Sequence, residues 1–179
     1  LAYLNEREVV VKQLGDRFKA QPGEIVERVS ALQEELKGSQ KALTAARAEL
    51  AVAKSAALAT QAVAVGEYQV LVARLDGVDG DGLQGAAVEL QDQLGDATAV
   101  VLGGLPDPMD QGKVILVAAF GKAVIAQGQQ AGKFIGAIAK RCGGGGGGRP
   151  NLAQAGGRDG AALDAALEAA SADLKKKLE

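Results

Sequence analysis

The chain has 179 residues and a formal net charge of −2, which excludes a general polyanion-binding protein. It contains no histidine and one cysteine, so imidazole catalysis, a zinc site of the Cys/His type and an internal disulfide are excluded. No run of about 18 apolar residues predicts a membrane span, so we expect no membrane partner and a cytoplasmic location. The start at Leu1 without methionine predicts a piece of a longer protein.

Residues 1–65 are predicted to form two helices joined by Gln21-Pro22-Gly23, a strong turn signal. Apolar residues recur at helical spacing in the first helix and in heptads from residue 24 to about residue 63. The predicted seam consists of Ile25, Val29, Leu32, Leu36, Leu43 and Leu50. Two helices, each with an apolar stripe, joined by a short turn predict a long antiparallel hairpin. Its expected role is a scaffold, a spacer or a dimer arm.

Residues 66–179 are predicted to form a small globular domain of the α/β (α+β) class. Apolar, β-rich runs predict strands at about 68–75, 98–102 and 113–120. Helical spacing predicts helices at about 83–94, 129–141 and 163–174, the first of them closed by Gly95. The resulting order, β-α-β-β-α, a glycine-rich loop and then α, predicts a small sheet covered by helices. We expect Cys142, at the end of the second helix, to be a small buried residue.

The segment 143–157 reads GGGGGGRPNLAQAGG and is the most unusual part of the chain. It contains no serine and lies between two helical patterns, which favours an ordered loop for close approach over a flexible tether. It lacks the Lys-Ser or Lys-Thr ending of a Walker A loop, and it follows a helix, unlike a dinucleotide fingerprint. No nucleophile accompanies a base, and Asp79-Gly80-Asp81 is too small for a calcium loop. Binding is therefore predicted, with no catalytic or metal-ligating residue.

Charge is distributed unevenly around this segment. Residues 111–158 carry seven basic side chains and no acidic one, whereas residues 66–110 carry one basic and nine acidic side chains. An acid-free stretch around a glycine cradle predicts a local site for a phosphate-bearing partner. The alternative is that these cations lie on several faces and are merely solvated.

The string from Gly143 to Gly157 resembles the C-terminal signature of alanyl-tRNA synthetase, a DHH-associated domain that also occurs in DHH phosphoesterases. The resemblance includes the preceding helical hairpin and covers nearly the whole chain. It implies a noncatalytic module that binds the elbow of tRNA(Ala) and links upstream aminoacylation and editing domains, and in some relatives it dimerises. ATP, magnesium and zinc are implied for the whole ligase, with no cofactor in this piece. Lysine is frequent in the family where this chain has Gly145, and aspartate where it has Asn151.

The residues and the resemblance together predict one binding surface for RNA. The glycines would admit an RNA backbone or an unstacked base, while the arginines, assisted by the basic end of the preceding helix, would contact phosphates. Gln154 would bond a base edge or a ribose. The predicted nucleic-acid-binding residues are Lys140, Arg141, Gly143, Gly144, Gly145, Gly146, Gly147, Gly148, Arg149, Asn151, Gln154 and Arg158.

Two other functions stay open at this stage. One is a structural dimerisation module that uses the heptads of the hairpin. The other is the substrate-binding half of a DHH phosphoesterase, in which the glycine motif ends in histidine and works with metal-binding Asp and His. This chain has Arg149 at that position and no histidine, which argues against the phosphoesterase.

Overall fold

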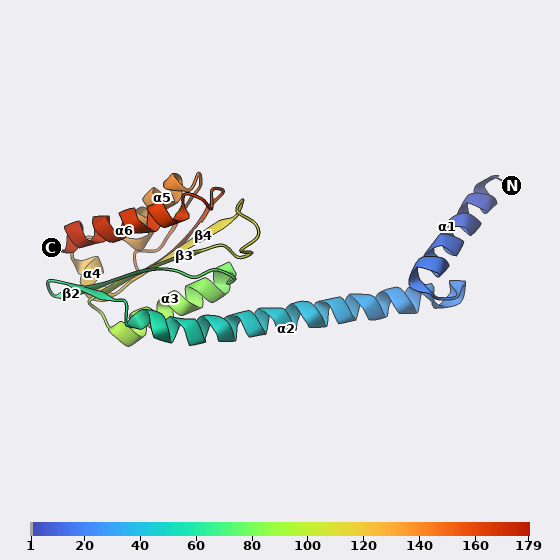
Figure 1. The fold of residues 1–179 in the computed structure, drawn as a ribbon, viewed down its shortest axis with the longest axis horizontal. Coiled ribbons are helices and arrows are strands. Elements are labelled where there is room, and N and C mark those ends of the chain that lie inside the picture. Colours follow the sequence, from blue (N-terminus) through green and yellow to red (C-terminus); the bar gives the residue numbers. More distant parts are fainter. Residues whose placement is uncertain (1) are drawn as a thin grey trace. The chain divides into compact units, whose positions relative to one another are not determined.

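The computed structural model describes the backbone of residues 2–179 and the side chains outside residues 2–8, 44 and 47–56. By its contacts the chain divides into two units, Leu1–Ala46 and Arg47–Glu179. The first holds helix α1 (Ala2–Phe18), a 3-10 turn (Pro22–Glu24) and the beginning of helix α2 (Ile25–Ala59). The two early helices of the predicted hairpin and the short turn between them are thus confirmed, and α1 does not lie antiparallel along α2 (Figure 1). None of the described helices is long and apolar enough to cross a membrane.

The turn between α1 and α2 is built by local hydrogen bonds. The backbone N–H of Gln21 donates to the carboxylate of Glu24 at 3.2 Å, and the N–H of Glu24 donates to the carbonyl of Gln21 at 2.8 Å. Ile25 is buried at the start of α2, and Val29 is half-buried. Farther along the predicted seam the apolar side chains face solvent, with Leu36 59% and Leu43 52% exposed. The side chain of Leu50 lies outside the described residues, and the seam stays a prediction.

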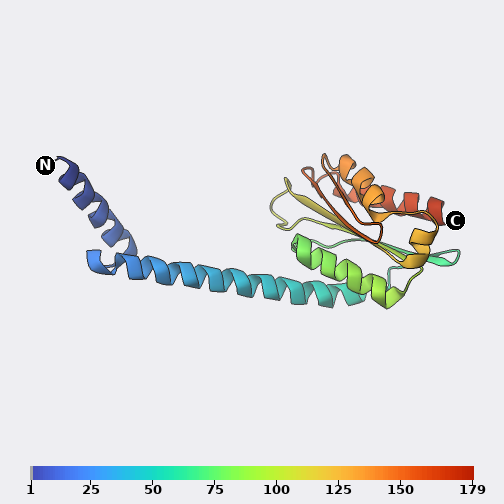
Figure 2. The same cartoon turned by 180° about the vertical axis from the view of Figure 1, so that it is seen from behind.

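The second unit is a six-stranded sheet between two helical layers. The strand order is β1-β2-β3-β4-β6-β5, and all neighbours are antiparallel except β2 and β3. The strands are β1 (Val63–Val65), β2 (Tyr68–Arg74), β3 (Thr98–Gly104), β4 (Val114–Phe120), β5 (Gly145–Gly148) and β6 (Leu152–Gly157). Helix α3 (Gly80–Leu94) covers one face, and α5 (Ala131–Arg141) and α6 (Leu163–Leu178) cover the other (Figure 2).

The central strands are apolar on both faces because both faces are covered. Every residue of β3 and β4 is buried. Alternate residues enter two separate cores: Val101 and Leu116 pack with α5 and α6, and Val100 and Val117 pack with α3. The parallel pair β2–β3 requires a crossover connection, which α3 supplies. Asp79 caps α3 by accepting from the N–H of Gly82 at 2.9 Å, and Gly95 ends it at φ 95°.

A group of charged side chains ties three elements together at one edge of the sheet. Arg74, at the end of β2, lies 2.9 Å from the carboxylate of Asp76 and 2.8 Å from that of Asp164 in the first turn of α6. Asp76 also accepts from the N–H of Leu105 after β3, at 2.9 Å. The hydrogen bond to Asp164, and the two carboxylates generally, raise the pKa of Arg74 despite its partial burial. This clamp fixes the loops from which α3 and β4 begin.

The predicted fold class is confirmed, and the structure adds elements that the sequence did not reveal. The glycine segment is not a loop: it forms β5, a turn and β6. Glycine is a poor strand former, so this hairpin depends on pairing with β4, a partner about 40 residues earlier in the chain, and cannot be read locally. The short strand β1 and helix α4 (Lys122–Ala126) were also missed.

Steric contact explains why several positions of the hairpin are glycine. A Cβ atom at Gly146 would lie 2.6 Å from the Cβ of Ala155, and one at Gly148 would lie 2.8 Å from the Cβ of Ala153. Real Cβ atoms do not approach so closely. By contrast, a Cβ at Gly145 would meet nothing within 4 Å. The run therefore contains positions that the fold requires to be glycine and positions that it leaves open.

We predict that Gly146→Ala lowers the free energy of unfolding by about 2 kcal/mol or more, because the added methyl must displace backbone. The matched control, Gly145→Ala, should be neutral or slightly stabilising, by up to about 1 kcal/mol, because its methyl points into open space and alanine reduces unfolded-chain entropy. Urea unfolding followed by circular dichroism measures both. Equal effects of the two substitutions would contradict the steric assignment.

Candidate nucleic-acid interface

Helix α5 lies alongside the outer edge of strand β5. A Cβ at Gly132 would lie 2.5 Å from the carbonyl oxygen of Gly148, and one at Gly136 would lie 2.8 Å from that of Gly146. The N–H of Arg149 donates to Leu152 across the hairpin, so by antiparallel alternation the polar groups of Gly146 and Gly148 point away from β6. These carbonyls are therefore covered by two glycines one helical turn apart, which protects an otherwise open sheet edge.

The base of the hairpin begins with a regular helix ending. Gly143 has φ 65°, its N–H donates to Lys140, and the N–H of Gly144 donates to Ala139, which is a Schellman motif. Beside it, the backbone carbonyl of Cys142 accepts hydrogen bonds from the N–H groups of Arg158 and Asp159, at 2.8 and 3.1 Å. The backbone of Arg158 thus lies next to the end of α5. Of the predicted cations, Lys140, Arg141 and Arg158 come together here, all exposed.

The tip of the hairpin carries the remaining predicted contacts. Residues 149–152 make the turn, with the N–H of Arg149 donating to the carbonyl of Leu152 at 2.9 Å. Two backbone hydrogen bonds fix the turn from two sides, both at 2.8 Å. The carbonyl of Pro150 accepts from the N–H of Ala131, and the carbonyl of Asn151 accepts from the N–H of Phe120. The side chains of Arg149 and Asn151 are exposed. The structure therefore separates Arg149 from Arg158 by the length of β6, which at about 3.3 Å per residue is about 20 Å.

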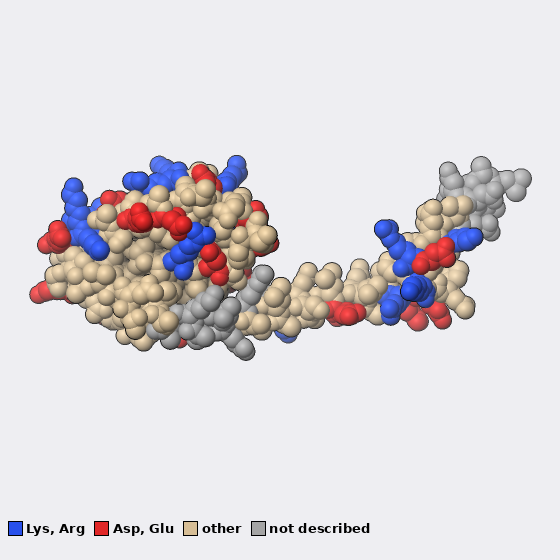
Figure 3. Space-filling model, in the orientation of Figure 1, with Lys and Arg blue, Asp and Glu red and all other residues tan. Residues whose placement is uncertain are grey.

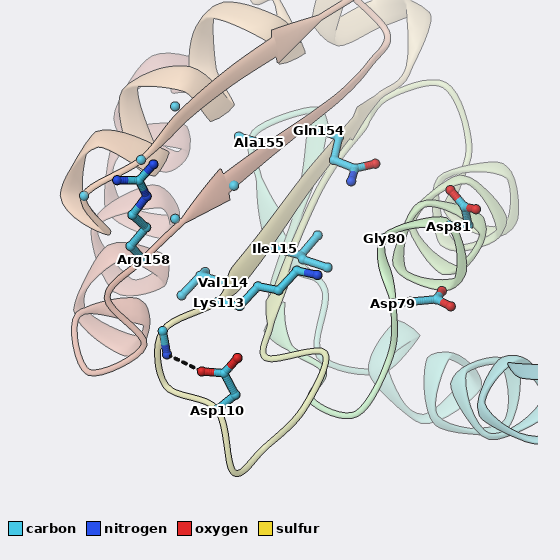
Figure 4. Close-up of a pocket in the computed structure, with 16 residues that line it drawn as sticks. Asp79, Gly80, Asp81, Asp110, Lys113, Val114, Ile115, Gln154, Ala155 and Arg158 are labelled. Carbon is cyan, nitrogen blue, oxygen red and sulfur yellow. Dashed lines mark hydrogen bonds between the residues drawn. The ribbon is translucent and has the colours of Figure 1, made fainter. Parts of the chain in front are cut away.

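An open hollow of about 1340 Å³ lies on the α3 side of this hairpin (Figure 4). Its floor is the glycine backbone of β5 and β6, and Gln154 stands at its border, with its amide nitrogen 2.6 Å from the position of a Cβ at Gly80. Lys113 and Arg158 line the hollow, and so do Asp79, Asp81 and Asp110. The charges counted along residues 111–158 did not reveal this mixture of lysine, arginine and aspartate. The three carboxylates lie before residue 111 in the sequence, and the fold brings them beside the hairpin. Over the described residues no acidic cluster is suited to hold a metal ion.

Four of the predicted cations make no ion pair with the side chains that the structure describes. Described ion pairs involve Arg74 and Lys122, and none of them involves Lys140, Arg141, Arg149 or Arg158. In Figure 3, lysine and arginine side chains gather along the upper rim of the globular unit, over α5 and α6. Exposed guanidinium groups without carboxylate partners are suited to bind phosphate.

Cys142 is fully buried at the end of α5, as the sequence predicted. A Cβ at Gly157 would lie 2.7 Å from its Cβ, so the thiol fills the space between α5 and the end of β6. Burial raises the pKa of the Cys142 thiol, and the nearby Asp159 carboxylate raises it further. The thiol is therefore a packing group and not a nucleophile.

The sequence and the fold of this chain are similar to those of known proteins. The DHHA1 domain model matches residues 67–176. This small α/β domain, with its glycine hairpin and exposed cations, has the features of a binding module. The chain belongs to the DHHA1 domain family.

Several alanine–tRNA ligases are similar to this chain over nearly its whole length. The chain is 89% identical over 178 residues to the enzyme of Synechococcus sp. (strain CC9311) and 86% identical to that of Prochlorococcus marinus (strain MIT 9303). Each match covers 99% of this chain and 20% of the relative, so the chain spans about one fifth of their length.

A solved structure is similar as well. The crystal structure of the C-Ala domain from Aquifex aeolicus alanyl-tRNA synthetase superimposes with a TM-score of 0.54 at 25% identity, covering 65% of this chain and 96% of that chain. The resemblance to the C-terminal domain of alanyl-tRNA synthetases is thus confirmed.

The raised pKa of Cys142 predicts a loss of stability at alkaline pH. In the unfolded chain the thiol ionises near its ordinary value of 9.0, whereas the folded thiol stays protonated. The native state then binds more protons, so its free energy of unfolding falls above about pH 9, by at most about 1.4 kcal/mol per pH unit from this group. Urea unfolding between about pH 8 and pH 10 should show a steeper fall for the wild type than for Cys142→Ala. Parallel pH dependences would contradict the assignment.

Proposed function

We propose that this chain is the tRNA-binding C-terminal module of an alanine–tRNA ligase. The observation that carries the proposal is the glycine hairpin itself. Its backbone is open on one side, and it lies in a DHHA1 domain. At both ends it has exposed cations that form no ion pair with any described side chain. A phosphate-rich partner of defined shape fits such a surface.

Each predicted residue has a distinct task in this proposal. Arg149 at the tip, and Arg158 with Lys140 and Arg141 at the base, contact phosphates of the same tRNA. Gln154 lies between these ends on the hollow side, where it bonds a base edge or a ribose hydroxyl. Gly145 presents backbone without a side chain, so RNA can approach the sheet closely. Since contacts to phosphate and ribose dominate, the shape of the tRNA elbow is what the module recognises.

The module works as a binding element and not as a catalyst. Its one thiol is buried with a raised pKa, and this piece takes no cofactor in the proposal. ATP, magnesium and zinc belong in this proposal to the aminoacylation and editing parts of the whole ligase. The module holds the tRNA(Ala) elbow while the acceptor end moves between those parts, and it acts in the cytoplasm, where translation takes place.

Homodimerisation is a second proposal, and it rests on a separate surface. The exposed leucines of α2, Leu32, Leu36 and Leu43, form an apolar stripe on the first unit. A second copy of the helix would bury this stripe. Such a dimer arm and the RNA surface use different residues, so both proposals can hold for the same protein.

Binding of tRNA(Ala) should depend strongly on salt. If about four phosphates are neutralised, the slope of log affinity against log salt should be about −3, at about −0.7 to −0.9 per contact. Filter binding or fluorescence anisotropy across about 50 to 200 mM salt measures this slope. A slope of zero, or equal affinity for an unrelated DNA duplex, would sink the proposal.

Arg149→Ala should weaken tRNA binding about tenfold and make the salt slope shallower by about 0.7 to 0.9, because one charge-assisted contact is lost. The fold should be intact, since Arg149 is exposed and its backbone hydrogen bond remains. Lys122→Ala is the matched control, because Lys122 is 88% exposed and lies on α4, outside the hairpin. Unchanged affinity of Arg149→Ala would remove this residue from the interface.

A further inference from the structure

The two ends of the hairpin that carry the predicted phosphate contacts are joined along one side by helix α5. The N–H of its first residue, Ala131, donates to the carbonyl of Pro150 at the tip, and its last turn leads into the base at Gly143. Gly132 faces Gly148 and Gly136 faces Gly146, so the helix accompanies β5 over its whole length. Any side chain on the outer surface of α5 therefore lies between the two ends.

That outer surface carries an unassigned lysine. The exposed positions of α5 are 133, 137, 140 and 141, one stripe at helical spacing, while Ala131, Phe134, Ile135, Ile138 and Ala139 are buried. Lys133 lies seven residues before Lys140, about 10 Å along the helix at about 1.5 Å per residue. Ala137 between them is too small to obstruct a ligand. The helix has no acidic residue.

The groups around Lys133 leave it available. It borders a small groove between α5 and α6 with Asp173 and Lys177. Lys177 lies over the ring of Phe134, 5.3 Å from its centre. Among the described residues Lys133 makes no ion pair, and the groove is lined by two lysines and one aspartate. The groove thus keeps a net positive charge.

The opposite, α3 side of the hairpin has a different charge balance. Arg149 and Arg158 border two hollows on this side, one at each end of the hairpin. Lys113 lies level with Arg158, because the next residue, Val114, pairs with Gly157, and it lines the larger hollow together with Asp79, Asp81 and Asp110. A phosphate laid across this hollow would meet three carboxylates and Lys113, whereas one laid along α5 would meet Lys133, Lys140 and Arg141, with Asp173 as the carboxylate that borders the groove.

We propose that the RNA backbone runs along α5, with Lys133 as a phosphate contact between the tip and the base of the hairpin, while the hollow takes uncharged base or ribose edges. This inference rests on the proposed function and adds to it a residue and a direction. It assigns the phosphate path to one side of β5. Lys133 was not singled out by the sequence, because its place beside the hairpin follows from the packing of α5.

Two matched variants of the whole 179-residue chain test this path. Lys133→Ala and Lys113→Ala each remove one exposed lysine, one on α5 and one in the hollow. Affinity for a tRNA(Ala) transcript is measured across salt, with circular dichroism to verify folding. We expect Lys133→Ala to weaken binding about fivefold and to make the slope shallower by about 0.7 to 0.9, and Lys113→Ala to leave the slope unchanged.

The other outcomes are equally decisive. A shallower slope for Lys113→Ala with no change for Lys133→Ala would place the phosphates in the hollow and overturn this inference, while tRNA binding itself would stand. Equal losses in both variants would also overturn it, because phosphates would then lie on both sides. A wild-type chain without salt-dependent tRNA binding would instead refute the proposed function.

Discussion

The approach of helix α5 to the backbone of strand β5 is the constraint on which the candidate interface depends. Two glycines one turn apart, Gly132 and Gly136, bring the helix against the carbonyls of Gly148 and Gly146. Larger side chains at these positions would push the helix away and uncover a sheet edge. The same contact fixes the tip of the hairpin, through Ala131 and Pro150, and its base, through the Schellman motif at Gly143.

This constraint divides the roles among the six consecutive glycines. Gly143 adopts a left-handed conformation, and Gly144, Gly146 and Gly148 lie where a Cβ would meet the backbone of β6. These four are required by the fold whatever the partner. Gly145 is free of such contacts. A run that resembles one recognition motif is therefore mostly a packing device, and its binding role rests on the backbone that it leaves open.

Electrostatics in the folded domain differs from the charge pattern along the chain. The acid-free stretch from residue 111 to residue 158 contains Lys122, which pairs with Asp96, and the cations of the hairpin, which the described ion pairs do not involve. The stretch did not reveal that α3 and the loop before β4 bring Asp79, Asp81 and Asp110 to one side of it. The hairpin consequently has a cationic side along α5 and a mixed side along α3, which gives a bound polyanion a direction.

The sequence by itself determined the strands and helices with a clear apolar period, such as β4 and α6, because burial on one or both faces leaves a local pattern. It also determined the family, through a long and unusual motif, and the burial of Cys142. Tertiary structure decided what the glycines do, because a glycine strand has no local signal: β5 exists through pairing with β6, which itself pairs with β4, and through cover by α5. It likewise decided which cations lie together: residues 140, 141 and 158 meet at one end, Arg149 lies at the other, and Lys133 comes between them. Such neighbourhoods depend on long-range packing, which spacing along the chain does not encode.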